Sequence, residues 1–188
     1  MDYKPTLNLP KTAFPMKAGL AEQEPKRLEK WEKGDLYHKI LAKRLPEKKY
    51  VLHDGPPYAN NNIHIGTAMH KILKDFVVKA KLGFGYYSPY IPGWDCHGLP
   101  IEHKVDKELG EKKKQMPPAA IRKVCRQYAT KYLDIQRKEF KRRGYLCSWD
   151  NPYVSMAPVY EAATAADQAK FVERGQVTRS KQPIYWCS

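Results

Sequence analysis

Residues 50–75 read YVLHDGPPYANNNIHIGTAMHKILKD, and this stretch decides the fold of the 188-residue chain. Its first three residues, 50–52, are apolar and predict a buried strand. Asp54-Gly55-Pro56-Pro57 ends that strand, because proline removes a backbone donor and fixes φ. A polar turn follows at 60–62. Beyond the turn, apolar residues at spacings of three and four predict one face of a helix that Gly83 ends, namely Met69, Ile72, Leu73, Phe76, Val77 and Ala80.

A second strand is predicted at residues 86–91, which are aromatic and β-branched, with Pro89 marking an edge or a bulge. Two strands joined by a helix form a βαβ unit with parallel strands and a right-handed crossover. Ligands of such sheets bind at the carboxyl ends of the strands. The fold class expected is therefore α/β with a Rossmann-like parallel sheet, in which Gly55-Pro56 lies beside Gly93-Trp94-Asp95.

The start of the predicted helix is suited to phosphate, because unpaired amides and a partial positive charge gather there. His64 and Asn60 add donors in the same region, and Gly66 lets a flat ring approach the backbone closely. The stretch has neither a Gly-x-x-x-x-Gly-Lys loop nor a Gly-x-Gly-x-x-Gly fingerprint. By itself His64 also fits an ordinary helix cap, and that alternative stays open.

Two motifs resemble a known family. His64-Ile65-Gly66-Thr67 resembles the His-Ile-Gly-His signature of class I aminoacyl-tRNA synthetases, and residues 92–102, PGWDCHGLPIE, are similar to the isoleucyl branch of bacterial type. The similarity extends over nearly the whole chain and includes residues 3–15, 27–37, 149–153 and 183–187.

The resemblance implies an N-terminal piece of such an enzyme. Residues 1–48 would form an extended arm and a helix, and residues 49–188 the first half of the Rossmann-type catalytic domain, ending where the editing insertion begins. The family is a cytoplasmic ligase that uses ATP and Mg²⁺ to activate isoleucine as isoleucyl-adenylate and then transfers it to tRNA(Ile). The complete protein is expected to be a monomer, and the isolated piece weakly active or inactive.

The same resemblance assigns the site residues. His64 and Thr67 are the catalytic candidates, although Thr67 departs from the second histidine of the signature. The ATP-binding residues would be Pro57, Tyr58, Ala59, Asn60, Asn61, His64, Gly66 and Thr67. Asn61 replaces the usual glycine, and asparagine tolerates a positive φ better than most residues.

For the amino acid, the carboxylate of Asp95 would hold the ammonium group of isoleucine together with the carbonyl of Pro56. Pro56 and Trp94 would wall the side-chain pocket. Asp95 fits a helix N-cap as an alternative. In the family, a cysteine matching Cys187 opens a zinc-binding pair, so Zn²⁺ is expected only in a complete protein.

The sequence has 34 Lys and Arg against 20 Asp and Glu, a net charge of +14. This charge fits an anionic partner and fits an ordinary lysine-rich surface equally well. Two other classes therefore stay open: a non-catalytic basic tRNA-binding module, and another nucleotidyl-transferring enzyme of the same fold. No apolar run reaches the roughly 18 residues of a membrane span, and the first 15 residues lack the apolar core of a signal peptide. Free thiols are expected at Cys96, Cys125, Cys147 and Cys187.

The remaining segments give further expectations. Residues 1–20 predict an extended arm anchored by Leu7, Leu9, Phe14 and Met16, and residues 21–42 a helix broken at Gly34. Residues 103–118 are charged, and their cluster Lys112-Lys113-Lys114 predicts a solvated loop, with a contact to RNA as the alternative. Residues 119–143 predict a long helix with one apolar and one basic side. A third helix begins at Ser155 or Ala157 and ends before Gly175, and a last strand covers residues 184–186. The basic side of the long helix fits nucleic acid or simple exposure to water.

Overall fold

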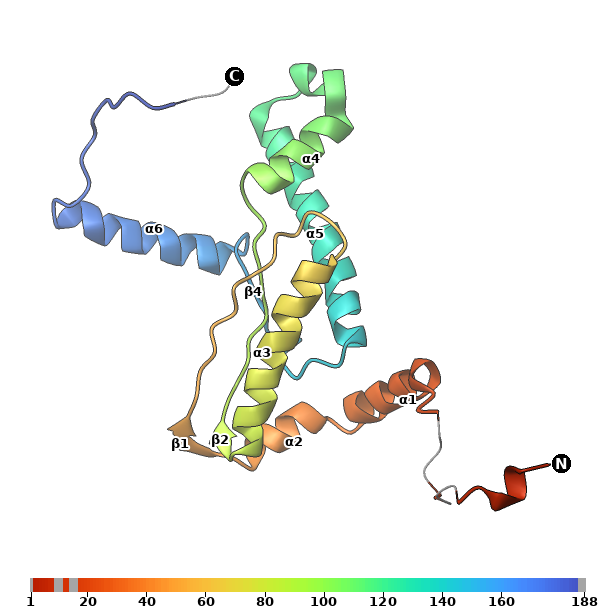
Figure 1. Ribbon diagram of the computed structural model, residues 1–188. Helices are drawn as coiled ribbons and strands as arrows, with labels where there is room; N and C mark the ends of the chain where they lie inside the picture. Colours follow the sequence, from red (N-terminus) through yellow and green to blue (C-terminus); the bar gives the residue numbers. More distant parts are fainter. Residues whose placement is uncertain (1, 9–11, 14–16, 186–188) are drawn as a thin grey trace. The chain divides into compact units, whose positions relative to one another are not determined.

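The computed structural model describes residues 2–8, 12–13 and 17–185, and Figure 1 shows their helices and strands. By its internal contacts the chain divides into two compact units, residues 1–36 and 37–188, which are described separately. The expected division of the domains after residue 48 stays a prediction.

The first unit contains a short 3₁₀ helix, η1 (Lys4–Thr6), and helix α1 (Leu20–Lys33). Helix α1 ends at Gly34, so the predicted break is confirmed, and the chain continues as α2 (Leu36–Ala42). Among the predicted anchors Leu7 is exposed, whereas Leu9, Phe14 and Met16 lie outside the described residues.

The second unit contains the predicted βαβ arrangement, but its strands are short. Strand β1 (Leu45–Lys49) pairs in parallel with β2 (Tyr86–Tyr87), and α3 (Ile65–Gly83) connects them. The buried strand predicted at residues 50–52 is wrong, because β1 lies earlier and is exposed throughout. Pairing stops where the amide of Tyr50 donates to the carbonyl of Tyr87 over 3.0 Å. Beyond that point Ser88-Pro89 ends the partner strand.

The segments that follow β1 and β2 run side by side (Figure 1). At their far end lies a second set of parallel strands. Strand β3 (Gly93–Trp94) pairs in parallel with β4 (Tyr153–Val154), and Tyr58 forms a parallel bridge with Asp95. A side chain at Gly93 would overlap the ring of Tyr153, since a Cβ there would lie 2.0 Å from Cζ. The close approach of β3 and β4 therefore requires glycine at this position.

The later helices follow the sequence pattern with one exception. Helix α5 (Pro118–Arg142) and helix α6 (Pro158–Glu173) confirm the two predicted helices, with Pro158 in the first turn of α6. The loop predicted at residues 112–114 is wrong, because the 3₁₀ helix η2 (Gly110–Gln115) occupies it. Helix α4 (Leu99–Leu109), which the sequence analysis did not predict, comes before it. An ion pair of 2.7 Å from Lys113 to Asp106 links η2 to α4. Ile184 and Tyr185 form no strand, and Trp186 lies outside the described residues.

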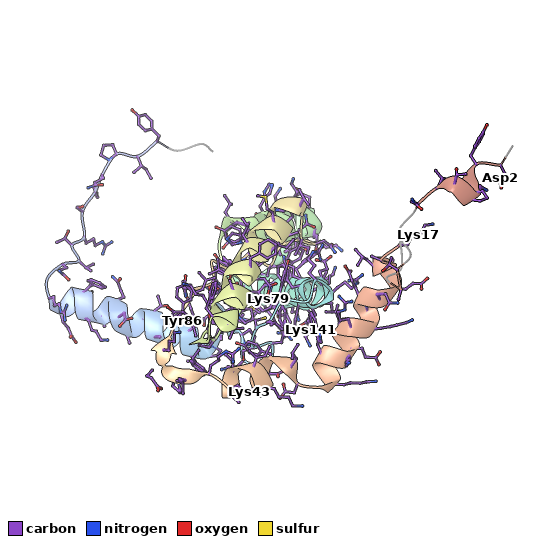
Figure 2. The ribbon with its side chains drawn as sticks, turned by 60° about the horizontal axis from the view of Figure 1, so that its bottom comes forward. Asp2, Lys17, Lys43, Lys79, Tyr86 and Lys141 are labelled. Atoms are coloured by element: carbon purple, nitrogen blue, oxygen red, sulfur yellow. The ribbon has the colours of Figure 1, made fainter. Side chains whose placement is uncertain are left out.

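The core lies where the side chains crowd around α3 and α5 (Figure 2). One cluster joins α4 and α5 to the segments around β3, and its buried members are Ala59, Trp94, Cys96, Ile101, Val105, Tyr128, Ala129, Leu133, Phe140 and Tyr145. A smaller cluster lies under the end of α3 and contains Val78, Leu82, Tyr90 and Cys147. The two clusters fix the positions of α3, α5 and β3 around the site.

Helix α3 faces the opposite way from the prediction. All six residues of its predicted apolar face are exposed, whereas the buried side carries Ala68, Lys71, Asp75, Val78 and Leu82. The helical period was predicted correctly, but the wrong face was predicted to be buried. The buried face carries two charged residues, Lys71 and Asp75, which are both held in ion pairs. Within the described residues nothing covers the apolar face, and no helix there is long and apolar enough to cross a membrane.

Candidate functional site

Backbone hydrogen bonds join the segment before His64 to the second motif. The amide of Asp95 donates to the carbonyl of Pro57, and the amide of Ala59 donates to the carbonyl of Asp95, both over 2.9 Å. We call these two bonds the Tyr58–Asp95 bridge. It confirms the expected position of the Gly55-Pro56 segment beside Gly93-Trp94-Asp95.

Asp95 is half-buried at the end of β3, and its side chain has two partners. Its Oδ1 accepts from the amide of His97 over 3.3 Å and from the hydroxyl of Ser155 over 3.4 Å. The alternative role as a helix N-cap is wrong, because α4 begins after Gly98 and has no side-chain cap. No residue in the described part of the chain donates to Oδ2, so this oxygen has capacity for a cation such as an ammonium group.

His64 caps α3. Its Nδ1 accepts from the amides of Gly66 at 3.1 Å and Thr67 at 3.3 Å. This geometry assigns the ring proton of a neutral imidazole to Nε2, which is then a donor at the exposed helix start. A Cβ at Gly66 would lie 2.9 Å from Cε1 of His64, so glycine is needed for the capping ring itself. A phosphate can reach Nε2–H directly, but it reaches the two amides only by displacing the ring.

Helix α5 holds the turn that leads from the Tyr58–Asp95 bridge to His64. The side-chain amide of Gln136 donates to the carbonyls of Tyr58 at 2.9 Å and Asn61 at 2.7 Å. The hydroxyl of Tyr128 donates to the carbonyl of Asn60 at 3.0 Å. Among the described residues Asp35 is the one non-glycine residue with a positive φ. Asn61 therefore makes this turn without the left-handed conformation for which glycine is favoured.

Trp94 lies in the core. Its ring is fully buried, its Nε1 donates to Gln136 at 3.1 Å, and it packs against Phe140 with ring centroids 6.4 Å apart. Through Gln136, α5 is therefore bonded both to Trp94 of β3 and to the turn before His64. Its role as a wall of the isoleucine pocket stays a prediction.

The sequence analysis missed the most highly connected residue of the site, Asp54, which is 1% exposed. Its carboxylate accepts from the ammonium groups of two lysines on α3: Lys71, and Lys74 at 2.7 Å. It also accepts from the hydroxyl of Tyr90 at 2.7 Å and the amide of Gly93 at 2.8 Å. The carbonyl of Asp54 accepts from the hydroxyl of Tyr153 at 2.6 Å. One buried residue thus joins α3, β3 and β4.

The charges around Asp54 keep it ionised. Burial alone raises the pKa of its carboxyl, but the ammonium of Lys71 and the hydrogen bonds from Lys71, Lys74 and Gly93 outweigh burial, so the pKa lies below its usual value. Burial and the same carboxylate raise the pKa of Tyr90 well above its ordinary value. The Tyr90 hydroxyl therefore stays protonated and donates to Asp54.

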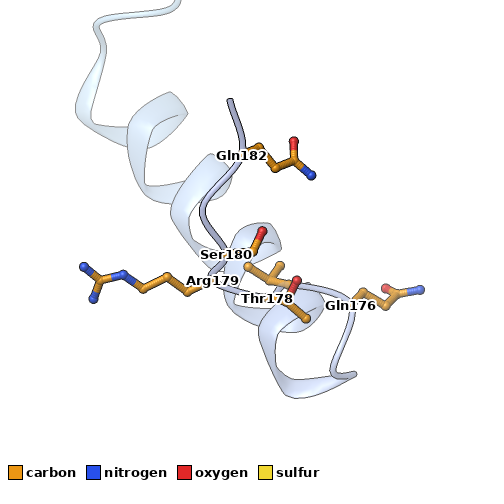
Figure 3. Close-up of a pocket in the computed structure, with 6 residues that line it drawn as sticks. Gln176, Thr178, Arg179, Ser180 and Gln182 are labelled. Atoms are coloured by element: carbon orange, nitrogen blue, oxygen red, sulfur yellow. The ribbon is translucent and has the colours of Figure 1, made fainter. Parts of the chain in front are cut away.

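The hollow that Figure 3 draws lies outside this site, and the described residues hold no metal cluster. The hollow in Figure 3 is lined by Gln176, Val177, Thr178, Arg179, Ser180 and Gln182, which all follow α6 and include none of the predicted site residues. The described residues contain no group of three or more His, Cys, Asp or Glu placed to hold a metal ion. Cys96, Cys125 and Cys147 are free thiols, as predicted, and Cys187 lies outside the described residues.

Comparison with known proteins defines the class. A family model described as "tRNA synthetases class I (I, L, M and V)" matches residues 26–188. The chain belongs to this family of class I tRNA synthetases.

The relatives point to one branch of the family. The chain is 61% identical to isoleucine--tRNA ligase of Nitratidesulfovibrio vulgaris (strain DSM 19637 / Miyazaki F) over 99% of its length. It is 59% identical to the enzyme of the same name from Thermotoga petrophila over its whole length. In both cases it spans 20% of the relative.

A solved structure supports the fold. The Agrobacterium radiobacter K84 agnB2 LeuRS, crystallised in a ternary complex with tRNA and LeuAMS, matches 85% of this chain with a TM-score of 0.65. The match covers 18% of that chain at 20% sequence identity, so it supports the fold and no statement about function.

Proposed function

We propose that this chain forms the first part of the catalytic site of an isoleucine--tRNA ligase. That enzyme activates isoleucine with ATP and Mg²⁺ to isoleucyl-adenylate and transfers it to tRNA(Ile). The observation that carries the proposal is the Tyr58–Asp95 bridge, because it places the turn that leads to His64 beside the carboxylate of Asp95. Relatives with that name match the chain over nearly its full length.

Each part of the site has a proposed task. Asp95 binds the ammonium group of isoleucine through Oδ2, with the carbonyl of Pro56 as a second acceptor. His64 donates from Nε2 to the phosphates of ATP, which bring Mg²⁺ with them. The activation step is a displacement at the α-phosphorus, in which a protein helps mainly by positioning the reactants and stabilising charge. His64 therefore acts as a donor and not as a base.

Exchange of labelled pyrophosphate into ATP by the purified 188-residue chain tests the proposal. Isoleucine is expected to stimulate the exchange, however slowly, and leucine is the matched control because it has the same atoms in a different branching. Exchange that is equal with both amino acids would contradict the proposal. If exchange is too slow to detect, failure of the chain to bind isoleucine in preference to leucine would contradict it.

A binding surface for tRNA is a second candidate role, favoured by the net charge of +14 and by the basic side of α5. Part of this basic side serves the fold instead. Arg126 pairs with Glu161 at 2.9 Å, and Arg137 lies over the ring of Trp94 at 5.6 Å. Binding of tRNA without any isoleucine-dependent exchange would favour a module that only binds RNA.

A further inference from the structure

The buried carboxylate of Asp54 touches both halves of the proposed site without reaching its ligands. On one side it pairs with Lys71 and Lys74, which lie two to three turns into the helix that His64 caps. On the other side it accepts from the amide of Gly93, two residues before Asp95. Lys74 also donates to the carbonyl of Gly55 at 3.2 Å, directly before Pro56.

The Asp54 carboxylate has more partners than a single stabilising ion pair needs. Four donors converge on one carboxylate, and they come from α3, from the segment after β2 and from β3. Each carboxylate oxygen accepts from one lysine and one further group, so both oxygens are fixed in direction. A fifth bond, from Tyr153, holds the backbone of the same residue against β4.

We infer that Asp54 is a positioning residue of the amino-acid activation site, and that it sets the distance between the His64 end of α3 and the Asp95 end of β3. The inference rests on the proposed function. The physical reason is that an adenylate spans both ends, and misplacing one end by about 1 Å can cost roughly a hundredfold in rate. Lys71 and Lys74 hold α3 to Asp54, and Gly93 holds β3 to it.

Asp75, which lies on α3, provides a matched control. It is 6% exposed, pairs with Lys79 at 2.5 Å and accepts from the amide of Leu146 at 3.2 Å. It is thus a buried carboxylate with a lysine and an amide partner, but it contacts neither β3 nor the segment before α3. The variants Asp54→Asn and Asp75→Asn each remove the charge of one buried carboxylate that pairs with a lysine of α3.

The first measurement needs no ligand. Hydrogen exchange at the amides of Ala59 and Asp95 reports the Tyr58–Asp95 bridge in the full chain. Asp54→Asn is expected to speed exchange at these two amides by about tenfold or more relative to Asp75→Asn, after correction for global stability. Equal exchange in the two variants would overturn the inference.

The second measurement uses a non-hydrolysable isoleucyl-adenylate analogue and calorimetry. Asp54→Asn is expected to weaken binding by about tenfold or more, and Asp75→Asn to leave it unchanged. Failure of the unaltered chain to bind the analogue would contradict the proposed function itself. Binding by the unaltered chain with equal losses in both variants would contradict the positioning role alone.

A double variant keeps the test decisive if Asp54→Asn does not fold. Asp54→Asn with Lys71→Met removes both charges of the most deeply buried pair, so the Lys71 ammonium is not left without its partner. Lys74 keeps its bond to the carbonyl of Gly55. Recovered stability without recovered affinity for the analogue is the expected result. Recovery of both together would show that the pair only stabilises the fold, and it would overturn the inference.

Discussion

Asp54, Asp95 and His64 each use a side-chain acceptor to hold backbone amides, and each does so at a different part of the site. Asp54 holds Gly93, Asp95 holds His97, and His64 holds the first turn of α3. Turns and helix starts leave amides without backbone partners, so such side chains decide the local geometry. The predictions at this scale separate that structural task from ligand binding.

His64→Ala and His64→Asn should both weaken the ATP-dependent step. Alanine removes the cap and the Nε2 donor, whereas asparagine is a good N-cap and removes only the donor. Loss of one such donor typically costs about 3 kcal/mol of transition-state stabilisation. In both variants the rate of pyrophosphate exchange should fall strongly, whereas the affinity for isoleucine, measured by titration, should fall only slightly.

The asparagine variant decides what His64 does. If His64→Asn exchanges pyrophosphate as well as the unaltered chain, the histidine is only a cap.

Asp95→Asn should weaken isoleucine binding by more than about tenfold and leave ATP affinity nearly intact. Asparagine can still accept from His97 and Ser155, so the variant removes the charge while keeping the local turn. Truncating one partner of a buried charge pair costs about 2–5 kcal/mol, and a half-buried group loses less. Calorimetry gives both affinities, with the exposed Asp134→Asn as the matched control. Unchanged isoleucine affinity would remove Asp95 from the site.

The free energy of unfolding should depend on pH through Asp54. Its pKa is lowered in the folded state, so the ionised form stabilises the fold above the unfolded value of about 3.9 and this contribution is lost as pH falls. Breaking a buried pair costs about 3–5 kcal/mol. Denaturant unfolding should therefore give a lower free energy of unfolding for Asp54→Asn than for the unaltered chain at pH 7. This difference, the gap between the two chains, should narrow below about pH 4. A gap independent of pH would show that charge is not what Asp54 contributes.

The positions of single residues were predictable from the sequence where a motif marks them, whereas the ligand-binding roles of His64 and Asp95 stay predictions. His64 and Asp95 stand in recognisable motifs, and their neighbours along the chain complete the geometry. Asp54 and Gln136 carry no such signal, because their partners are far away in sequence: Tyr153 bonds to Asp54, and Gln136 to Tyr58. Only the folded chain brings these groups together.

At the scale of elements, α3 has an apolar face that is exposed and a buried face that carries charge. Phe76→Ala should change the free energy of unfolding by less than about 0.5 kcal/mol, as is usual for a surface site. Leu82→Ala, the matched truncation on the buried face, should cost about 2–5 kcal/mol. Denaturant unfolding of both variants measures the difference. Equal losses would show that the apolar face is covered in solution.

Helices were predicted better than strands, for a physical reason. A helix is set by local periodicity and end signals, and α5 and α6 show both. Strands β3 and β4 have two residues each and exist only because Gly93 lets Tyr153 approach. The facing direction of α3 could not be predicted either, because it depends on ion pairs with Asp54 that the local pattern does not contain.

At the scale of the whole molecule, the chain spans 20% of the relatives that it matches. Its second unit holds two parallel sheets with two strands each. The site nevertheless has both of its proposed ends, His64 and Asp95, within that one unit. Binding of each ligand to its own end is therefore the central claim.

The most direct test of that claim is an amide NMR titration of the 188-residue chain, first with isoleucine and then with ATP. Isoleucine should shift the amides of Gly55, Tyr58 and residues 93–97. ATP should shift a different set of amide signals, those of residues 64–67. Shifts confined to the basic side of α5 or to residues 176–182, or no shifts with either ligand, would contradict the account.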